Sequence, residues 1–235
     1  NGLAWVARNS GSTMNLDGVA FGNGLYCAVG GGLTQNSSIT RSSDGITWSN
    51  QTVSFNYLYD VTFGNGVFVV QGIRGQIRTS SDAVNWTLFQ GDGGYLYDAT
   101  FAQGYFVAGG AKLFGSQKIV TSTDGLTWIS RPLDTNLSSP IRGVAYGNGY
   151  FVAVGEKGLI LQSDPIFRLT AGNTLTRRDW ILTGETGRSY RFQFSEDLGA
   201  KWIDLTNFMS TAETTLLHDP AAIDTPTRFY RVISP

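Results

Sequence analysis

The 235-residue chain has few charged and few reactive side chains. Charged residues make up 15% of the sequence and the formal net charge is −1, so no basic surface of the kind that binds nucleic acid is expected. The single cysteine, Cys27, cannot form a disulfide within the chain, and the apolar run around it predicts a buried side chain rather than a metal ligand. No apolar run approaches the about 18 residues of a membrane-spanning helix.

The common catalytic and cofactor motifs are also absent from the sequence. The only histidine, His218, precedes Asp219-Pro220 in an expected loop, where a solvated side chain is more usual than a catalytic one. There is no Ser-His-Asp set, phosphate loop or metal-ligand spacing, so neither a cofactor nor a metal is expected. The low charge, the many Ser, Thr, Asn and Gly residues and the start at Asn1 predict an extracellular, cell-surface or periplasmic protein cut from a precursor.

An internal repeat is the main positive feature of the sequence. A Ser-Xaa-Asp turn followed by a Trp occurs at 42–48, 80–86 and 122–128, and a partial fourth copy ends at residue 164. The four Asp residues are 38, 42 and 40 residues apart, and a period near 40 with strand-like flanks is typical of a β-propeller. Each Asp is expected to accept backbone hydrogen bonds in its turn while the Trp covers the hairpin. The residues predicted to be structural in this way are Asp44, Trp48, Asp82, Trp86, Asp124, Trp128, Asp164 and Trp5.

A second repeated signature predicts the inner strands of each repeat. Its four copies, at 18–24, 60–66, 98–104 and 143–149, each end in a turn rich in Gly and Asn and are followed by an apolar run. Asn-Gly between two such runs favours a hairpin, because both residues tolerate positive φ. With the strand before each Asp and the strand after each Trp, every repeat has four strands. The expected fold class is therefore all-β, with a small propeller of four blades.

The two ends of the repeat region are complementary. The fourth repeat stops at Asp164 without a Trp or an outer strand, whereas residues 1–10 align with the second half of a turn and the strand after it. The strand around Trp5 is therefore expected to complete the fourth blade, and residues 1–165 are assigned to a propeller closed by its N-terminal strand. The alternative is that Trp5 belongs to an upstream blade outside this chain.

The repeat is lost after residue 165, and residues 166–235 are assigned to a second domain. Short alternating segments separated by turn residues predict a small antiparallel β-sandwich. The segments Gly184–Tyr190, Ser195–Trp202 and Phe229–Val232 resemble the motifs of a C-terminal module common in large secreted bacterial proteins, although the second is one residue longer than usual. This resemblance implies an accessory domain without an activity of its own.

The turn sequence at 42–48 resembles the Asp-box, or BNR repeat, of sialidases and many other secreted propellers. That resemblance implies the fold more strongly than a function, because the fold hosts many activities. A sialidase needs three converging arginines, and only Arg74 and Arg142 remain once the arginines on outer strands and beside turns are set aside. Other Asp-box propellers help photosystem II assemble, which implies an assembly factor or accessory subunit of a membrane complex as another role.

The candidate binding residues lie where the chain enters the inner strands, on the face opposite the Asp turns. Tyr-Leu-Tyr-Asp occurs there in two adjacent repeats, and a polar, aromatic mouth of this kind suits a sugar or a peptide. The predicted mouth consists of Asp17, Tyr59, Asp60, Tyr97, Asp98 and Arg142. The alternative is that the Tyr side chains pack between blades and the Asp side chains cap turns.

These observations favour a non-catalytic binding or assembly module that recognises a protein or a glycan. The first alternative is a glycan-active hydrolase that uses Asp60 and Asp98 as paired carboxylates. The second is an accessory subunit associated peripherally with a membrane complex.

Overall fold

The structure is a computed structural model in which nearly every element is a β-strand. It describes residues 4–32, 36–113, 115–133, 138–163, 168–171, 179–184, 186–196, 201–212, 214–220 and 228–234. The chain divides into two compact units, Asn1–Tyr146 with Phe151–Gln162 and Gly147–Tyr150 with Ser163–Pro235. The all-β class predicted from the sequence is confirmed. Among the residues that the structure describes, no helix is long and apolar enough to cross a membrane.

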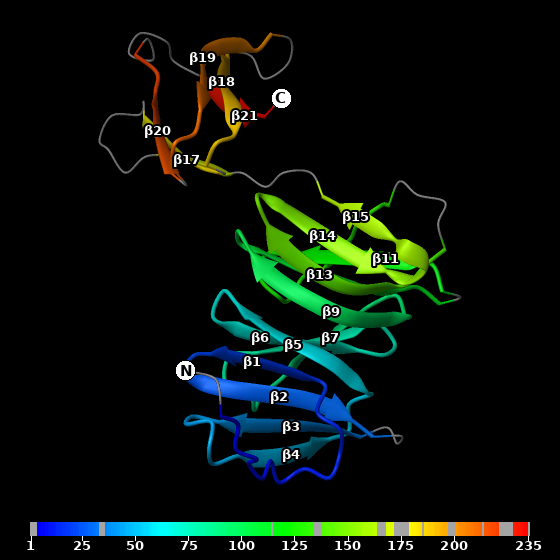
Figure 1. Ribbon diagram of the computed structural model, residues 1–235. Helices are drawn as coiled ribbons and strands as arrows, with labels where there is room; N and C mark the ends of the chain where they lie inside the picture. The colour runs from blue at the N-terminus through cyan, green and yellow to red at the C-terminus, as the bar shows by residue number, and fades with distance from the viewer. Residues whose placement is uncertain are drawn as a thin grey trace. The chain divides into compact units, whose positions relative to one another are not determined.

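Four antiparallel sheets of consecutive strands are the blades of a small propeller (Figure 1). They belong to the first unit except for Gly147–Tyr150, the hairpin of the fourth blade, which is grouped with the second unit. Blade 1 comprises β1 (Gly18–Gly22), β2 (Leu25–Gly31), β3 (Ser37–Ser42) and β4 (Ser49–Val53). Blade 2 comprises β5 (Leu58–Gly64), β6 (Val67–Gly72), β7 (Gln76–Ser80) and β8 (Thr87–Gln90). Blade 3 comprises β9 (Tyr95–Ala102), β10 (Tyr105–Ala111), β11 (Gln117–Ser122) and β12 (Ile129–Ser130). Blade 4 comprises β13 (Ile141–Gly147), β14 (Tyr150–Gly155) and β15 (Ile160–Gln162), with the 3-10 turn Glu156–Gly158 before β15.

The predicted hairpins join the first two strands of every blade. The residue after each inner strand is left-handed, with φ of 48° at Asn23, 47° at Asn65, 49° at Gln103 and 51° at Asn148. Asn adopts this conformation more readily than most residues, and a glycine follows in every copy. The repeated signature therefore predicted these turns correctly.

The core lies between blades, because the second strands of blades 1 to 3 are buried on both faces over most of their length. The side chains of Val29, Phe68, Val69 and Phe106 are fully buried, as expected from the nearly continuous apolar runs. These side chains belong to two clusters, one shared by blades 1 and 2 and one shared by blades 2 and 3. Packing of each blade onto the next is thus the main source of burial in this unit.

At the first two junctions between blades, the close approach of the following blade requires a glycine at the end of the inner strand. The ring of Phe63 in blade 2 fills the position that a Cβ on Gly22 in blade 1 would occupy. The ring of Phe101 in blade 3 does the same at Gly64 in blade 2. We refer to these two arrangements as the Phe–Gly contacts.

Polar ties join the same blades at their hairpin ends. The Asn23 side-chain amide donates to the carbonyl oxygens of Gly66 (2.9 Å) and Ser81 (3.0 Å) in blade 2. The amide of Asn65 donates in the same way to Thr123 in blade 3, at 3.2 Å. Blades 1 and 2 therefore each hold the Asp turn of the blade that follows.

The N-terminal segment differs from its prediction. Residues 4–10 form no strand, and the Trp5 side chain is 92% exposed. The carbonyl of Ser10 instead accepts a hydrogen bond from the Thr40 hydroxyl in blade 1, at 3.0 Å. Among the described residues blade 4 has three strands, and its short edge strand β15 offers little backbone for another strand to pair with. Asp164, the predicted partial fourth turn, lies outside the described residues.

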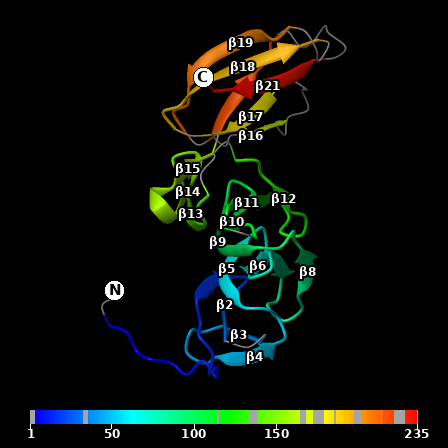
Figure 2. The ribbon, with the colours of Figure 1, turned by 90° about the vertical axis from the view of Figure 1, so that its right-hand side faces the viewer.

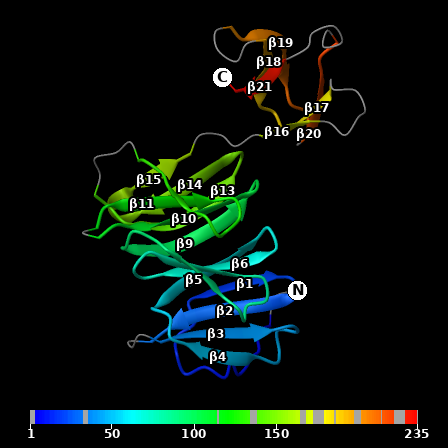
Figure 3. The same cartoon turned by 180° about the vertical axis from the view of Figure 1, so that it is seen from behind.

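The blades follow one another in chain order, with blades 1 and 4 at opposite ends of the row. The same order is visible from the side and from behind (Figures 2 and 3). Within the first unit the blades thus form an open row, and residues 4–10 do not add the predicted closing strand to blade 4.

The second unit is a sandwich of two three-stranded antiparallel sheets, as predicted. One sheet has the order β16 (Arg168–Ala171), β17 (Asp179–Thr183), β20 (Thr214–His218), and the other β19 (Ile203–Met209), β18 (Ser189–Ser195), β21 (Phe229–Ile233). Their shared core is Leu182, Tyr190, Phe192, Leu217 and Val232. Packing explains the pairing of Gly184 with Tyr190, because a Cβ on Gly184 would lie only 2.5 Å from the Tyr190 hydroxyl oxygen.

A methyl group at the first Phe–Gly contact is expected to destabilise the first unit. Gly22→Ala should lower its free energy of unfolding by about 1–3 kcal/mol, the usual cost of overpacking, as measured by urea denaturation. Combining Gly22→Ala with Phe63→Leu should cost less than the sum of the two single changes, since the smaller side chain leaves room for the methyl. Strict additivity would show that Phe63 is not the group displaced.

Candidate functional site

The three described Asp turns have nearly identical geometry. One oxygen, Oδ1 of Asp44, Asp82 or Asp124, accepts hydrogen bonds from the two backbone amides that lie two and three residues later, all at 2.8 Å. The same oxygen accepts a serine hydroxyl two residues earlier, at 2.8 to 2.9 Å. These backbone amides lower the pKa of Asp44 to about 2, and they lower the pKa values of Asp82 and Asp124 as well. The oxygens that hold the turn are not available for other chemistry.

The Trp of the second turn lacks the hydrogen bond that the others make. The indole N–H of Trp48 donates to the Gly45 carbonyl (3.2 Å), and Trp128 makes the equivalent bond at 3.0 Å. The second turn has Ala83 instead of glycine, and its carbonyl accepts from the Arg41 guanidinium of blade 1 at 3.4 Å. Trp86 Nε1 is buried without a partner. In the third turn the Gly125 carbonyl accepts from both Trp128 and the Thr79 hydroxyl of blade 2, so this carbonyl also ties the turn to the preceding blade.

At the opposite end of the strands, four tyrosines form a continuous aromatic surface that we call the tyrosine ladder. It consists of Tyr57 and Tyr59 from blade 2 and Tyr95 and Tyr97 from blade 3. The ring centroids are 5.2 Å apart for Tyr57–Tyr59, 5.1 Å for Tyr59–Tyr97 and 5.9 Å for Tyr95–Tyr97, the last pair being almost parallel at 3°. These distances are typical of favourable aromatic pairs, so the ladder is a connected surface across two blades.

A cation and an anion extend the ladder at its two sides. The Arg142 guanidinium from blade 4 lies 4.1 Å from the centre of the Tyr97 ring, a cation–π contact. Its Nε also donates to Glu156 Oε1 at 3.1 Å, and this hydrogen bond raises the pKa of Arg142. At the blade 1 side, burial and a hydrogen bond to Asp17 raise the pKa of the Tyr57 phenol.

Asp60 and Asp98 lie behind the ladder and tie neighbouring blades together. Asp60 Oδ2 accepts from the Gln71 side chain at 2.9 Å and from the backbone amide of Ala99 in blade 3 at 3.2 Å. Asp98 Oδ2 accepts from the amide of Val144 in blade 4 at 2.6 Å. Burial raises the pKa of both carboxyls, and the negative charge of Asp98 raises that of Asp60 further. Each acid therefore has a structural bond to the next blade.

The structure thus brings all six predicted mouth residues to one end of the blades. Tyr97 contacts both Tyr59 and Arg142, and Asp17 reaches the ladder through Tyr57. Asp60 and Asp98 directly follow Tyr59 and Tyr97 in their strands. The ladder residues missing from the prediction are Tyr57 and Tyr95, which the repeated Tyr-Leu-Tyr-Asp could have identified. Gln71 lies opposite Asp60 in the β5–β6 hairpin and Glu156 lies 14 residues after Arg142, but neither belongs to a repeated motif, so the repeat did not mark them.

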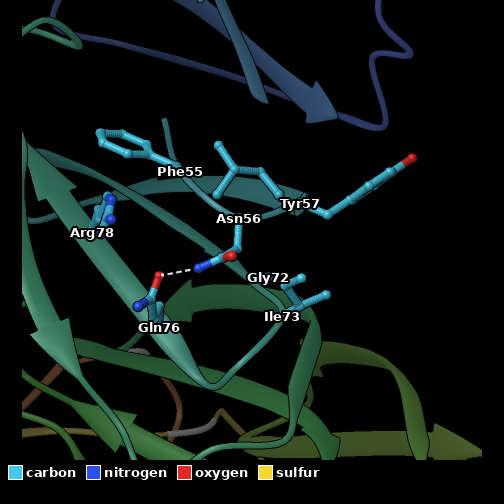
Figure 4. A pocket seen from close by; sticks show the side chains of 8 residues that line it. Phe55, Asn56, Tyr57, Gly72, Ile73, Gln76 and Arg78 are labelled. Atoms are coloured by element: carbon cyan, nitrogen blue, oxygen red, sulfur yellow. Dashed lines mark hydrogen bonds between the residues drawn. The ribbon is translucent and has the colours of Figure 1, made fainter. Parts of the chain in front are cut away.

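A small hollow adjoins the ladder in blade 2 (Figure 4). Within it, the Asn56 amide donates to Gln76 Oε1 at 3.0 Å, and the Arg78 guanidinium lies 3.8 Å from the centre of the Phe55 ring. Its lining residues are Phe55, Asn56, Tyr57, Leu58, Gly72, Ile73, Gln76 and Arg78. Among the described residues, no group of three or more His, Cys, Asp or Glu side chains is arranged to hold a metal ion.

The second unit has its own buried polar network. The Asp219 carboxylate, 0% exposed, accepts from Arg228 Nη1 at 2.7 Å and from the Tyr230 hydroxyl at 2.9 Å. Burial and the bond to this carboxylate raise the pKa of Tyr230 to about 12. His218 is paired with Asp179 at 2.7 Å.

The comparisons with known proteins concern the fold. No family model matches the sequence, and no curated protein matches it. The computationally designed Ika4 protein is 13% identical with a TM-score of 0.52, over 69% of this chain and 98% of Ika4. The β-propeller domain of Myceliophteria thermophila Cps50 (Swd1) is 10% identical with a TM-score of 0.45, over 85% of this chain and 73% of that one. YCF48 bound to D1 peptide is 16% identical with a TM-score of 0.48, over 91% and 80%. The likeness to Ika4 shows a common fold.

Removing the charge of Asp60 is expected to change how stability depends on pH. Its raised pKa means that the folded chain keeps a proton which the unfolded chain has lost, so its contribution to stability falls as the pH rises through the folded pKa. Asp60→Asn keeps an oxygen for Ala99 but cannot ionise. The stability difference between variant and wild type, measured by urea unfolding, should therefore shift in favour of the variant as the pH rises above about 4, the usual pKa of an aspartate. A pH-independent difference would contradict the shifted pKa, and Asp60→Ala should be destabilising throughout.

In the second unit, alkaline pH is expected to weaken the Asp219 network. Because the Tyr230 pKa is raised to about 12, its contribution to stability is present below pH 10 and is lost as the pH rises through 12. Tyr230→Phe should lower stability at pH 7 and flatten the decline above pH 10, as followed by circular dichroism. The same decline in wild type and variant would assign the transition to another group.

Proposed function

We propose that this chain is a non-catalytic binding module that holds a segment of a partner protein on the tyrosine ladder. The observation that carries the proposal is the connected set of Tyr57, Tyr59, Tyr97 and Arg142, assembled from three blades. Tyrosine and arginine dominate the binding energy of protein interfaces, because they combine a large apolar area with a polar end. A surface of this composition favours a peptide chain as its ligand.

The engagement of the inner acids supports the non-catalytic part of the proposal. Asp60 and Asp98 each use an oxygen to hold the backbone of the next blade. A glycosidase needs two carboxyl groups that reach the substrate from either side of the scissile bond. If the wild-type chain hydrolysed a glycan and Asp60→Asn abolished that activity, the chain would be a hydrolase and the proposal of a non-catalytic module would be wrong.

A glycan remains the second candidate ligand, because the faces of the same rings suit the apolar faces of sugars. Tyr95 is 39% exposed and lies almost parallel to Tyr97. An extracellular, cell-surface or periplasmic location belongs to the proposal and is supported by the low content of charged residues, 15%. Peripheral association with a membrane complex would be one setting in which a peptide-binding module acts.

The test is a peptide display library and a glycan array, each probed with the whole chain. Tyr59→Ala combined with Tyr97→Ala should weaken binding of the selected peptide at least about tenfold, because central aromatic residues carry most interface energy. Tyr105→Ala is the matched control, since Tyr105 lies at the hairpin end of blade 3. Selection on the glycan array alone would favour the sugar, and equal binding by all variants would remove the ladder as the site.

A further inference from the structure

Both ends of the blade row expose apolar side chains that are buried at equivalent positions elsewhere. In blade 1, Val19 is 63% exposed, whereas its counterparts Val61 and Ala99 are 3% and 8% exposed. In blade 4, Val154 is 46% exposed, whereas its counterpart Val29 is fully buried. The face that each inner blade uses against a neighbour is thus open at each end of the row.

The two open faces carry the two halves of a Phe–Gly contact. Phe21 in blade 1 is the counterpart of Phe63, and it is 56% exposed. Gly147 in blade 4 is the counterpart of Gly22, and a Cβ at Gly147 would meet no atom within 4 Å. Blade 1 therefore presents the ring, and blade 4 presents the glycine that receives it.

The polar ties are divided between the ends in the same way. Asn148 in blade 4 is the counterpart of Asn23, whose amide donates to the Asp turn of the next blade. The matching acceptor in blade 1 is the Ser43 carbonyl, which is the counterpart of the Ser81 carbonyl. The donor belongs to blade 4 and the acceptor to blade 1, so this tie runs in the same direction as the one between blades 1 and 2.

We propose that blade 4 of one copy packs onto blade 1 of a second copy through these matching groups. The occupant is a second copy because this chain carries both halves of a junction that it already forms between its own blades. Such a head-to-tail contact is heterologous and closes into a ring when the rotation allows. Two copies of four blades make a ring of eight, within the range of about 4–8 blades in known propellers.

The first test is the mass of the intact chain in solution by analytical ultracentrifugation. One chain has a mass of 25.5 kDa, and the wild type should sediment with twice that mass. Phe21→Ser should return it to the mass of a single chain, whereas Leu88→Ser, at an exposed position on the outer strand of blade 2, should not. A wild-type chain that stays monomeric at every concentration, or a dimer that Phe21→Ser leaves intact, would overturn the proposal.

Cysteine cross-linking separates two copies from closure within one chain. Phe21→Cys and Gly147→Cys in the same chain should give, after oxidation, a disulfide-linked species with the mass of two chains. Gly22→Cys with Phe63→Cys is the positive control, because that contact exists within the chain and should bridge without changing the mass. The native Cys27 is fully buried and does not interfere. A bridged species with the mass of one chain, or no bridge where the control bridges, refutes the proposal.

Discussion

The approach of one blade to the next through a Phe–Gly contact is the constraint on which the rest of the first unit depends. Because Gly22 and Gly64 have no side chain, the rings of Phe63 and Phe101 reach the backbone of the preceding blade. That distance lets the second strands bury both faces, which places the core between blades. A single blade would expose the apolar face that it buries against the next blade, so each blade depends on its neighbours for stability.

The tyrosine ladder is a product of the same spacing. Tyr59 and Tyr97 lie on different blades, and their rings are 5.1 Å apart only because the inner strands are held side by side. Asp60 and Asp98, the residues that follow Tyr59 and Tyr97, reinforce this arrangement by accepting hydrogen bonds from the amides of Ala99 and Val144. A surface that is already ordered before binding loses less conformational entropy when a ligand arrives.

How far the structure could be predicted depended on the range of the interactions involved. The Asp turns and Asn-Gly hairpins are local, so Asp44 or Asn23 and their neighbours were enough to predict them. The partner of Asp98 lies 46 residues away, and no residue type marks a carboxylate that will bind a distant amide. The prediction of a closing strand at Trp5 was wrong for a related reason. The sequence around Trp5 matches half a turn, but a strand also needs the edge of a sheet to pair with. The Ser10 carbonyl is instead bound by Thr40 in blade 1.

The ties between blades have a consequence for the number of blades. Asn23 and Asn65 make the same bond one blade further along, and neither contact distinguishes the second blade from the third. These hydrogen bonds do not depend on where in the row the two blades lie. Duplication of the second repeat would therefore add a junction of the kind that joins blades 1 and 2, so this propeller could gain a blade during evolution without a new interface having to arise.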